Sequence, residues 1–516
     1  MYFSAVIDLL KKDGNFREVT NFKQDSLVME KFQSVKFDQL SYDSRKISAT
    51  TLFFVKGQAF KLDYLNQAER KGLRFYVSQT ICSVDSALVA ILVKDVRKAM
   101  ALIAQAFFGY PEEKLKIVAF TGTKGKTTST YFTKGILDEI FAEKVAMFST
   151  METTLDGDHY FKSELTTPES LDLYEMMSQA IINGMTHLVM EVSSQAYKLQ
   201  RVYGLTFDIG VFLNISSDHI SPMEHPDFED YFYCKLQLLH HSKKAILNRE
   251  SDHFEELMKE VRNLGIPTYV YGRSEKECDY FINDNFNDLF DFKVCKGQRF
   301  HSESSFVGEY TLKIPGDFNQ DNALAAMMAA SLLGVDSDSI KEALSQISVP
   351  GRMERLTKNN GSSVYIDYAH NKLSLETLLQ FVKKYHSGLL IVVLGSTGGK
   401  GISRRKDFGE VLSSFADVGI LTADDPNFED PILIAEEIAQ SISSEKIKVE
   451  IIVDRKQAIR YALSLAKSAE DVVVLAGKGA DEYQMIQGKK IFYAGDVAVA
   501  KETINTSGFN DEGTVS

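Results

Sequence analysis

The chain has 516 residues, of which 44% are hydrophobic and 25% charged, the composition of a globular protein with room for about three domains. Its formal net charge of −13 argues against a nucleic-acid partner, because a phosphate backbone requires a basic face, although a small anionic substrate needs only a few local cations. The four cysteines lack metal-ligand spacing, and no run approaches the ~20 apolar residues that span a bilayer, so we expect a cytoplasmic protein with no membrane insertion.

Residues 1–110 alternate short helices and strands. The opening residues, MYFSAVIDLLKKDGNF, have no basic leader followed by a long apolar core, and they predict a short helix. The apolar runs 51–57 and 87–93 predict strands, and the stretch 97–110 predicts a helix. The proline and charges of the next segment, 111–116, indicate a linker that ends a first domain at about residue 110.

The middle part, residues 111–348, contains apolar strands separated by helical patterns. This alternation is typical of a mainly parallel sheet covered by helices. The spacing within 283–308 indicates a small antiparallel addition, and the alanine-rich stretch 319–334 predicts a closing helix. The expected strands are Lys116–Phe120, His187–Val192, Ile209–Leu213, Ala245–Asn248 and Thr268–Gly272.

The last part, residues 349–516, repeats this alternation. Most of its apolar runs give way to glycine, aspartate or serine. Ligands of open parallel sheets bind beyond the carboxyl ends of the strands, so polar residues at these ends are candidate site residues. The expected strands are 363–369, 388–395, 418–425, 448–454 and 471–479.

The sharpest motif is a glycine-containing loop directly after a strand and before a helix. Its glycines let backbone amides face an anion, Lys126 supplies a charge to the β- and γ-phosphates, and Thr127 offers a hydroxyl to Mg²⁺. A strict phosphate loop would have glycine in place of Phe120, so this loop is a variant. The alternative, a glycine-rich turn that happens to contain lysine, fits the strand and helix on either side poorly. The loop alone does not distinguish among kinases, GTPases and ligases. Its residues are Gly122, Thr123, Lys124, Gly125, Lys126, Thr127 and Thr128.

Three later residues in the middle part are candidates for metal or phosphate chemistry. Glu191 ends a strand and suits a magnesium ligand, or else it belongs to a helix-capping cluster. His219 either binds metal or phosphate or is structural. Lys235 lies among aromatic residues, where a lysine ordinarily extends to the surface; burial instead would make its amine nucleophilic and open to carbamylation.

The last part collects polar residues at its predicted strand ends. Acidic groups there can receive a substrate ammonium, and the basic loop 395–400 with its following arginines suits an anion. Each segment is also explained by ordinary loop chemistry, but their joint placement at one sheet edge favours a site. The candidates are Arg352, Asp367, His370, Asn371, Arg404, Arg405, Asp424, Asp425, Pro426, Asn427, Gly477 and Asp481.

Together these motifs resemble those of the Mur ligases. GTKGKTT, TTPES, EVSSQA, NISSDH, YFYCK, PGRMER, DYAHN, DDPN and GKGADEYQ occur in that family's order between Ser41 and Gln484, and most resemble the members that add the third residue of the peptidoglycan peptide. The resemblance implies an α/β fold of three domains: a smaller α/β UDP-sugar-binding domain (1–110), a central phosphate-loop ATPase domain (111–348) and a Rossmann-like amino-acid-binding domain (349–516).

The resemblance also implies an activity. It is the ATP- and Mg²⁺-dependent addition of an amino acid to UDP-N-acetylmuramoyl-L-alanyl-D-glutamate through an acyl phosphate. We expect the enzyme to be a monomer. The implied catalytic and metal residues are Lys126, Thr127, Glu191, His219 and Lys235, the last as a carbamate. ATP would contact the loop residues 122–128 with Asn319, Arg352, Asp367, His370 and Asn371. The UDP-linked substrate would contact Ser44, Thr166, Thr167, Ser194 and Arg201, and the amino acid would contact Arg404, Arg405, Asp424, Asp425, Pro426, Asn427, Gly477 and Asp481.

The segment Asp424–Asn427 bears on the identity of that amino acid. Family members that use meso-diaminopimelate carry DNPR, whose arginine faces the extra carboxylate, whereas this chain reads DDPN. A terminal ammonium prefers carboxylates to a guanidinium, so we expect L-lysine, with meso-diaminopimelate, ornithine or another diamino acid as alternatives. Lys124, Gln195 and Asp481 also depart from the common pattern. The rival functions are a folylpolyglutamate-synthetase-like ligase, a phosphate-loop NTPase switch and an inactive homologue.

Overall fold

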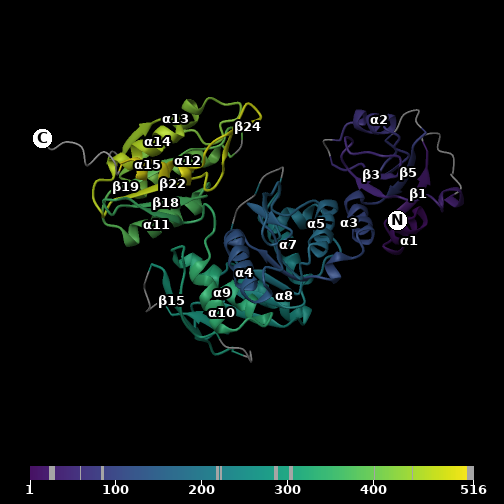
Figure 1. Cartoon of the computed structure of the whole chain (residues 1–516), viewed down its shortest axis with the longest axis horizontal. Coiled ribbons are helices and arrows are strands. Elements are labelled where there is room, and N and C mark those ends of the chain that lie inside the picture. Colours follow the sequence, from purple (N-terminus) through teal and green to yellow (C-terminus); the bar gives the residue numbers. More distant parts are fainter. Residues whose placement is uncertain are drawn as a thin grey trace. The chain divides into compact units, whose positions relative to one another are not determined.

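The computed structural model divides the chain into two compact units (Figure 1). The first comprises Met1–Asp284, Lys293–Gly308 and Asp321–Ala343; the second comprises Asn285–Phe292, Glu309–Gln320 and Leu344–Ser516. None of the helices described is long and apolar enough to cross a membrane. The structure describes residues 1–21, 29–57, 60–82, 87–216, 220, 224–283, 289–300, 306–399, 401–443 and 446–507.

The N-terminal part of the first unit is built on a sheet with the order β1-β5-β4-β3-β2. Helix α1 shows how the sequence produces its layers: Phe3, Val6, Ile7 and Leu10 recur at helical spacing and are all buried against the sheet core. A 3-10 helix, η1 (Met29–Phe32), precedes β2. The elements are α1 (Phe3–Lys12), β1 (Phe16–Thr20), β2 (Gln39–Ser41), β3 (Thr51–Phe54), α2 (Leu62–Arg70), β4 (Phe75–Ser78), β5 (Val89–Val93) and α3 (Val96–Phe107).

The central sheet of the first unit has parallel strands in the order β13-β12-β11-β6-β10-β7. Most of their residues are buried on both faces, as expected of strands covered by helices on each side. The strands are β6 (Lys116–Thr121), β7 (Val145–Phe148), β10 (His187–Glu191), β11 (Ile209–Phe212), β12 (Ala245–Asn248) and β13 (Thr268–Gly272). The helices are α4 (Lys126–Phe141), α5 (Ser170–Ile182), α6 (Ser194–Lys198), α7 (Phe228–His240), α8 (Phe254–Leu264), α9 (Asp317–Leu332) and α10 (Ser337–Gln346).

Short strands extend this sheet at both ends. Beyond β7 come the antiparallel β8 (Glu152–Thr154) and β9 (Tyr160–Lys162), which the sequence did not predict because they are short and β9 is exposed. Beyond β13 come β14 (Tyr280–Ile282), β15 (Asp291–Lys296) and β16 (Gly308–Thr311). The pairing of β14 with β15 is antiparallel, which confirms the antiparallel addition expected near 283–308.

The second unit contains a sheet with the order β17-β18-β22-β19-β20-β21, parallel except for β17. The hairpin of β23 and β24 is separate from it. The strands are β17 (Glu354–Thr357), β18 (Ser363–Asp367), β19 (Leu390–Leu394), β20 (Val418–Leu421), β21 (Lys448–Ile451), β22 (Val472–Ala476), β23 (Tyr483–Ile486) and β24 (Lys489–Phe492). The helices are α11 (Lys372–Tyr385), α12 (Ser403–Phe415), α13 (Pro431–Gln440), α14 (Arg455–Leu465) and α15 (Asp496–Ser507).

The expected parallel strands are all present, each within a few residues of its predicted bounds. The segment 111–116 differs from a loose linker, because Pro111 begins the 3-10 helix η2 (Pro111–Glu113) and Leu115 joins the core of the first unit. Its apolar residues therefore tie residues 1–110 to the central sheet. The boundaries at 110 and 348 stay predictions.

Candidate active site

The phosphate loop follows β6 and ends where α4 begins at Lys126. Gly125 has φ +85°, and a Cβ there would lie 2.2 Å from Asn322 Oδ1, so this position requires glycine. Asn214, after β11, holds the loop on its other side: its Oδ1 accepts from Lys124 N at 2.9 Å and its Nδ2 donates to Lys124 O at 3.1 Å. The strand–loop–helix geometry therefore fits an anion at the start of α4.

Oxygen donors suited to Mg²⁺ meet beside this loop. Glu191 is fully buried at the end of β10, and its Oε1 accepts from Thr127 Oγ1 at 2.8 Å. Thr150 N and Oγ1 donate to the same carboxylate at 2.7 and 2.9 Å. Glu191 does not cap the following helix, because Ser193 does so by accepting from Ala196 N. A hydroxyl and a carboxylate are the hard ligands that Mg²⁺ prefers, so the residues present fit this ion. His219 lies outside the described residues.

Lys235 is buried, with 2% of its surface exposed, and does not extend to solvent. Its Nζ donates to Gly122 O at 2.8 Å, the same carbonyl that accepts from Lys126 Nζ at 2.8 Å. The Nζ also lies 4.9 Å from the ring centroid of Tyr231, whose hydroxyl is 3.0 Å from Thr123 Oγ1. Helix α7 thus brings Lys235 directly to the phosphate loop, where its carbamylation stays a prediction.

The residues predicted to contact the UDP-linked substrate lie near the end of β10 and in the N-terminal part. Thr166 Oγ1 lies 3.1 Å from Thr150 Oγ1, and Thr167 Oγ1 donates to Glu191 O at 3.0 Å, so both lie beside the metal donors. Ser194 is buried at the start of α6, and Ser44 is half-buried in the N-terminal part.

Arg201 leads to a buried charge cluster that the sequence did not reveal. Its Nε donates to Glu169 Oε1 at 3.1 Å, while Lys56 and Arg97, from the N-terminal part, reach Glu169 Oε2 at 2.8 and 3.2 Å. Burial alone would raise the pKa of Glu169, but Lys56, Arg201 and Arg97 outweigh it and hold that pKa below its usual range. Glu169 belongs to the TTPES motif, but nothing in the sequence indicated which cations would meet it.

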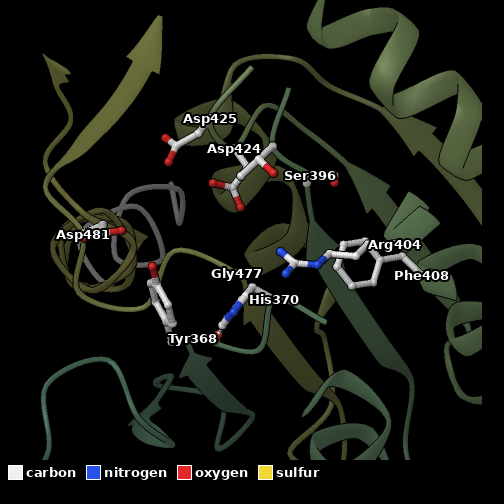
Figure 2. Close-up of a pocket in the computed structure, with 11 residues that line it drawn as sticks. Tyr368, His370, Ser396, Arg404, Phe408, Asp424, Asp425, Gly477 and Asp481 are labelled. Atoms are coloured by element: carbon white, nitrogen blue, oxygen red, sulfur yellow. Dashed lines mark hydrogen bonds between the residues drawn. The ribbon is translucent and has the colours of Figure 1, made fainter. Parts of the chain in front are cut away.

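The second unit has a pocket at the carboxyl ends of β18, β19, β20 and β22 (Figure 2). Figure 2 shows Arg404 of α12 reaching the same space as Asp424, which follows β20. The pocket therefore offers carboxylates and a guanidinium to one ligand. It is lined by Tyr368, His370, Gly395, Ser396, Thr397, Arg404, Phe408, Asp424, Asp425, Gly477 and Asp481.

A buried lysine partly neutralises the acidic side of this pocket. Lys478 is 1% exposed, and its Nζ lies 2.9 Å from Asp425, 3.7 Å from Asp481 and 3.8 Å from Asp424. Burial raises the pKa of Asp424 to about 6, against the opposing effect of Lys478 and Arg455. Three carboxylates thus surround one internal ammonium on the acidic side of the pocket. The sequence singled out the carboxylates of this loop but not the lysine among them.

Arg405 does not line the pocket, although it is adjacent to Arg404 in sequence. It is 3% exposed and forms ion pairs at 2.7 Å with Glu429 and with Glu437. Asn427 also lies outside the lining: it adopts φ +53°, and its Oδ1 accepts from Gly488 N of the β23–β24 turn at 2.8 Å. Pro426 is absent from the lining as well, and Lys400 lies outside the described residues.

The predicted ATP residues outside the phosphate loop make structural contacts within the second unit. Asp367 Oδ2 accepts from Met353 N at 2.8 Å, and Asn371 caps α11 by accepting from Ser374 N at 3.0 Å. Asn319 Nδ2 donates to Pro315 O at 2.6 Å. The Arg352 guanidinium lies 5.1 Å from the Tyr368 ring centroid, and His370 Nδ1 lies 2.8 Å from Tyr368 O. Their contact with ATP stays a prediction.

The fold and these two sites define an α/β phosphate-loop protein with a charged pocket in its second unit. Comparison with known proteins gives the family. The chain matches the models of the Mur ligase middle domain over residues 120–330 and of the Mur ligase glutamate ligase domain over residues 351–479. The chain therefore belongs to the Mur ligase family, and it is an ATP-dependent, amide-bond-forming enzyme.

Individual relatives extend this similarity over nearly the whole chain. It is 50% identical over 498 residues to the UDP-N-acetylmuramoyl-L-alanyl-D-glutamate–L-lysine ligase of Streptococcus thermophilus, covering 96% of this chain and 98% of that one. It is 51% identical to a UDP-N-acetylmuramyl-tripeptide synthetase of Lactococcus lactis subsp. cremoris, with the same coverage. Among solved structures, a UDP-N-acetylmuramoyl-L-alanyl-D-glutamate–2,6-diaminopimelate ligase superposes with a TM-score of 0.63 and 25% identity, covering 92% of this chain and 96% of that one.

Proposed function

We propose that this enzyme adds L-lysine to UDP-N-acetylmuramoyl-L-alanyl-D-glutamate in the synthesis of peptidoglycan precursors. The observation that carries the proposal is the charge pattern of the pocket in Figure 2, where Asp424, Asp425 and Asp481 provide negative charge and Arg404 provides positive charge. L-Lysine has one carboxylate for the guanidinium and a side-chain ammonium for the carboxylates. The names of the relatives from Streptococcus thermophilus and Lactococcus lactis support the same reaction.

The pocket also bears on the alternative acceptor, meso-diaminopimelate. Its second carboxylate would need a second cation, and DDPN provides none. Arg405 does not supply it either, because Glu429 and Glu437 already hold its guanidinium. A second carboxylate near Asp424 or Asp425 would meet like charge, which disfavours diaminopimelate.

The reaction proceeds in two steps. A carboxylate oxygen of the UDP-linked substrate attacks the γ-phosphorus of ATP, forming an acyl phosphate and releasing ADP. The unprotonated amine of lysine then attacks the acyl carbon, the amide bond forms as the nitrogen releases one proton to solvent, the C–O bond to phosphate breaks and inorganic phosphate leaves. Mg²⁺, when bound, neutralises charge on the phosphate oxygens.

The described residues divide this work. Lys126 and the amides at the start of α4 bind the phosphates, and Thr127 with Glu191 would hold Mg²⁺. Lys235 as a carbamate would add a third oxygen ligand beside the loop, and the second anionic one. In the second unit, Arg404 binds the carboxylate of lysine and the carboxylates bind its side-chain ammonium, so that the α-amine remains available for attack. We further propose a cytoplasmic monomer with domain boundaries near residues 110 and 348.

The test is acceptor-dependent release of phosphate from ATP in the presence of UDP-N-acetylmuramoyl-L-alanyl-D-glutamate and Mg²⁺. We expect release and tripeptide product with L-lysine, and at least tenfold lower kcat/KM with meso-diaminopimelate or ornithine. Preference for diaminopimelate would keep the ligase and refute the assignment of the pocket. Hydrolysis that ignores every acceptor would instead indicate an NTPase switch.

A further inference from the structure

One series of polar side chains, buried at Ser194 and His225 and half-exposed at Asp230 and Lys198, takes no part in the steps above. It runs from Ser194, at the start of α6, to His225, Asp230 and Lys198. The ring of His225 is fully buried; its Nε2 lies 2.9 Å from Ser194 Oγ, and its Nδ1 lies 2.6 Å from Asp230 Oδ2. Lys198 Nζ donates to the same Asp230 oxygen at 2.6 Å. Both nitrogens of the imidazole therefore have defined partners.

The chemistry of each group fixes the direction of these hydrogen bonds. A carboxylate only accepts, so His225 Nδ1 donates to Asp230. Lys198 already supplies a cation beside that carboxylate. The tautomer of His225 with its proton on Nδ1 satisfies Asp230 and leaves Nε2 as an acceptor. The Ser194 hydroxyl donates to Nε2, which leaves only the lone pairs of Ser194 Oγ for another molecule.

A metal site is the competing explanation for these residues. His225, Asp230 and Cys234 offer ligand atoms within 4.8 Å of one another. Burial, however, raises the pKa of the Cys234 thiol to about 11, so the sulfur keeps its proton at neutral pH. A bound cation would also have to displace the Lys198 ammonium from Asp230 and break the imidazole contact. The arrangement therefore suits the orientation of a hydroxyl better than a metal.

We propose that His225 is a positioning residue for the UDP-linked substrate. It fixes the Ser194 hydroxyl as a hydrogen-bond acceptor, and the matching group on the substrate is an N–H, the chemistry of the amides in UDP-N-acetylmuramoyl-L-alanyl-D-glutamate. A carboxylate or phosphate oxygen is excluded as its partner, because two acceptors repel each other. The inference rests on the proposed function, because Ser194 is assigned to this substrate only by the resemblance to the Mur ligases.

Two substitutions of His225 test the two ring nitrogens of the imidazole separately. Asparagine at this position places an amide near Nδ1 and keeps the contact with Asp230, but it does not reach Ser194. Glutamine places its amide oxygen near Nε2 and can still accept from Ser194. We expect His225→Asn to raise the KM for the UDP-linked substrate about tenfold, as for loss of one hydrogen bond. The kcat and the KM values for ATP and L-lysine should stay within about twofold of wild type. His225→Gln should restore most of the affinity for the UDP-linked substrate.

A matched control is His159→Asn, because His159 is exposed and contacts Asp156 through the same ring nitrogen at 2.9 Å. It should leave all constants unchanged. Equal effects of His225→Asn and His225→Gln, or a rise in all three KM values, would overturn the proposal in favour of a purely structural histidine.

A double-mutant cycle with Ser194→Ala tests whether the effect passes through the hydroxyl. Ser194→Ala alone should raise the KM for the UDP-linked substrate about tenfold, and adding His225→Asn should change it no further. Additive effects of the two substitutions on this KM, or a wild-type KM in Ser194→Ala, would refute the inference. If lysine-dependent phosphate release continued in these variants, the proposed function would stand. Absence of lysine-dependent release in the wild-type enzyme would instead refute the proposed function.

One measurement does not depend on how the variants fold. In enzyme labelled with ¹⁵N-histidine, the ring signals of His225 are identified among those of ten histidines by their loss in His225→Gln, or by their contact with Ser194 if that variant does not fold. The expected pattern is a protonated Nδ1 and an unprotonated Nε2. A proton on Nε2 would mean that Ser194 accepts from the ring, and the proposal would be wrong.

Discussion

The phosphate loop and the amino-acid pocket place charged side chains in different ways. In the loop, Lys126 and Lys235 both donate to one backbone carbonyl, Gly122 O, at 2.8 Å. In the pocket, Lys478 is held by carboxylates, and the neighbouring Arg405 by Glu429 and Glu437. Two lysines of the loop thus meet at one backbone carbonyl, whereas the pocket distributes charge among fixed ion pairs and leaves Arg404 facing the ligand space.

The comparison predicts the largest effect at Lys126. Lys126→Met should lower kcat by about 10²–10³-fold, because the charge on the transferred phosphate loses its partner. Phosphate release under saturating substrates is the measurement, and Lys144→Met, at an exposed residue between α4 and β7, is the matched control. A loss below about tenfold would mean that the loop amides alone stabilise the phosphates.

Lys235 tests whether the loop also uses a modified lysine. Lys235→Gln should lower kcat about 10²-fold, since an anionic ligand is lost, while L-lysine KM stays the same. Enzyme equilibrated with ¹³C-bicarbonate should show a carbamate carbon signal that disappears in this variant. An unmodified Lys235 in fully active enzyme would make it a simple cation of the loop.

The adjacent arginines separate binding from stability in the pocket. Arg404→Met should raise the KM for L-lysine about 10–100-fold without changing the melting temperature, because one charged hydrogen-bond partner of the ligand is removed. Arg405→Met should instead lower the free energy of unfolding by about 1–3 kcal/mol, because half-exposed Glu429 and Glu437 lose a buried partner. The reverse pattern would exchange the roles of the two residues.

The smallest expected effect is the pH dependence of lysine binding. The pKa of Asp424 is raised to about 6 by burial, so this carboxylate is charged above that pH and neutral below it. As pH falls below 6, the KM for L-lysine should therefore rise by up to about tenfold per pH unit until other groups titrate. Asp424→Asn should have a raised KM that does not vary across this range, and retention of the pH dependence in that variant would assign it to another group.

Local pattern was enough to predict the parallel strands and the phosphate loop. The strands β6, β10 and β12 are largely apolar segments of four to six residues. Glycines in a loop between a strand and a helix indicate a turn that binds phosphate. The short strands β8 and β9 were missed because they have little apolar sequence of their own and pair only at the sheet edge.

The charge partners could not be predicted, because they are distant in sequence. Arg404 and Arg405 look equivalent in the chain, and only the turn of α12 directs one to the pocket and the other to α13 and the loop before it. Glu169 contacts Lys56 and Arg97, which both lie more than seventy residues earlier in the chain; the separation from Arg97 is 72 residues. Lys478 was visible in the GKGAD motif, but its role among three carboxylates depends on how β20 and β22 end.

Helix α7 has a consequence for how this enzyme can change during evolution. Within two turns it contacts His225 through Asp230, the loop threonine Thr123 through Tyr231 and the Gly122 carbonyl through Lys235. A single inserted or deleted residue in these turns would rotate everything beyond it by about 100° and misalign the contacts on one side or the other. Insertions and deletions should therefore accumulate in the loops on either side of α7. The number of residues between Asp230 and Lys235 should stay constant, because it sets the distance between the contacts near the two substrates.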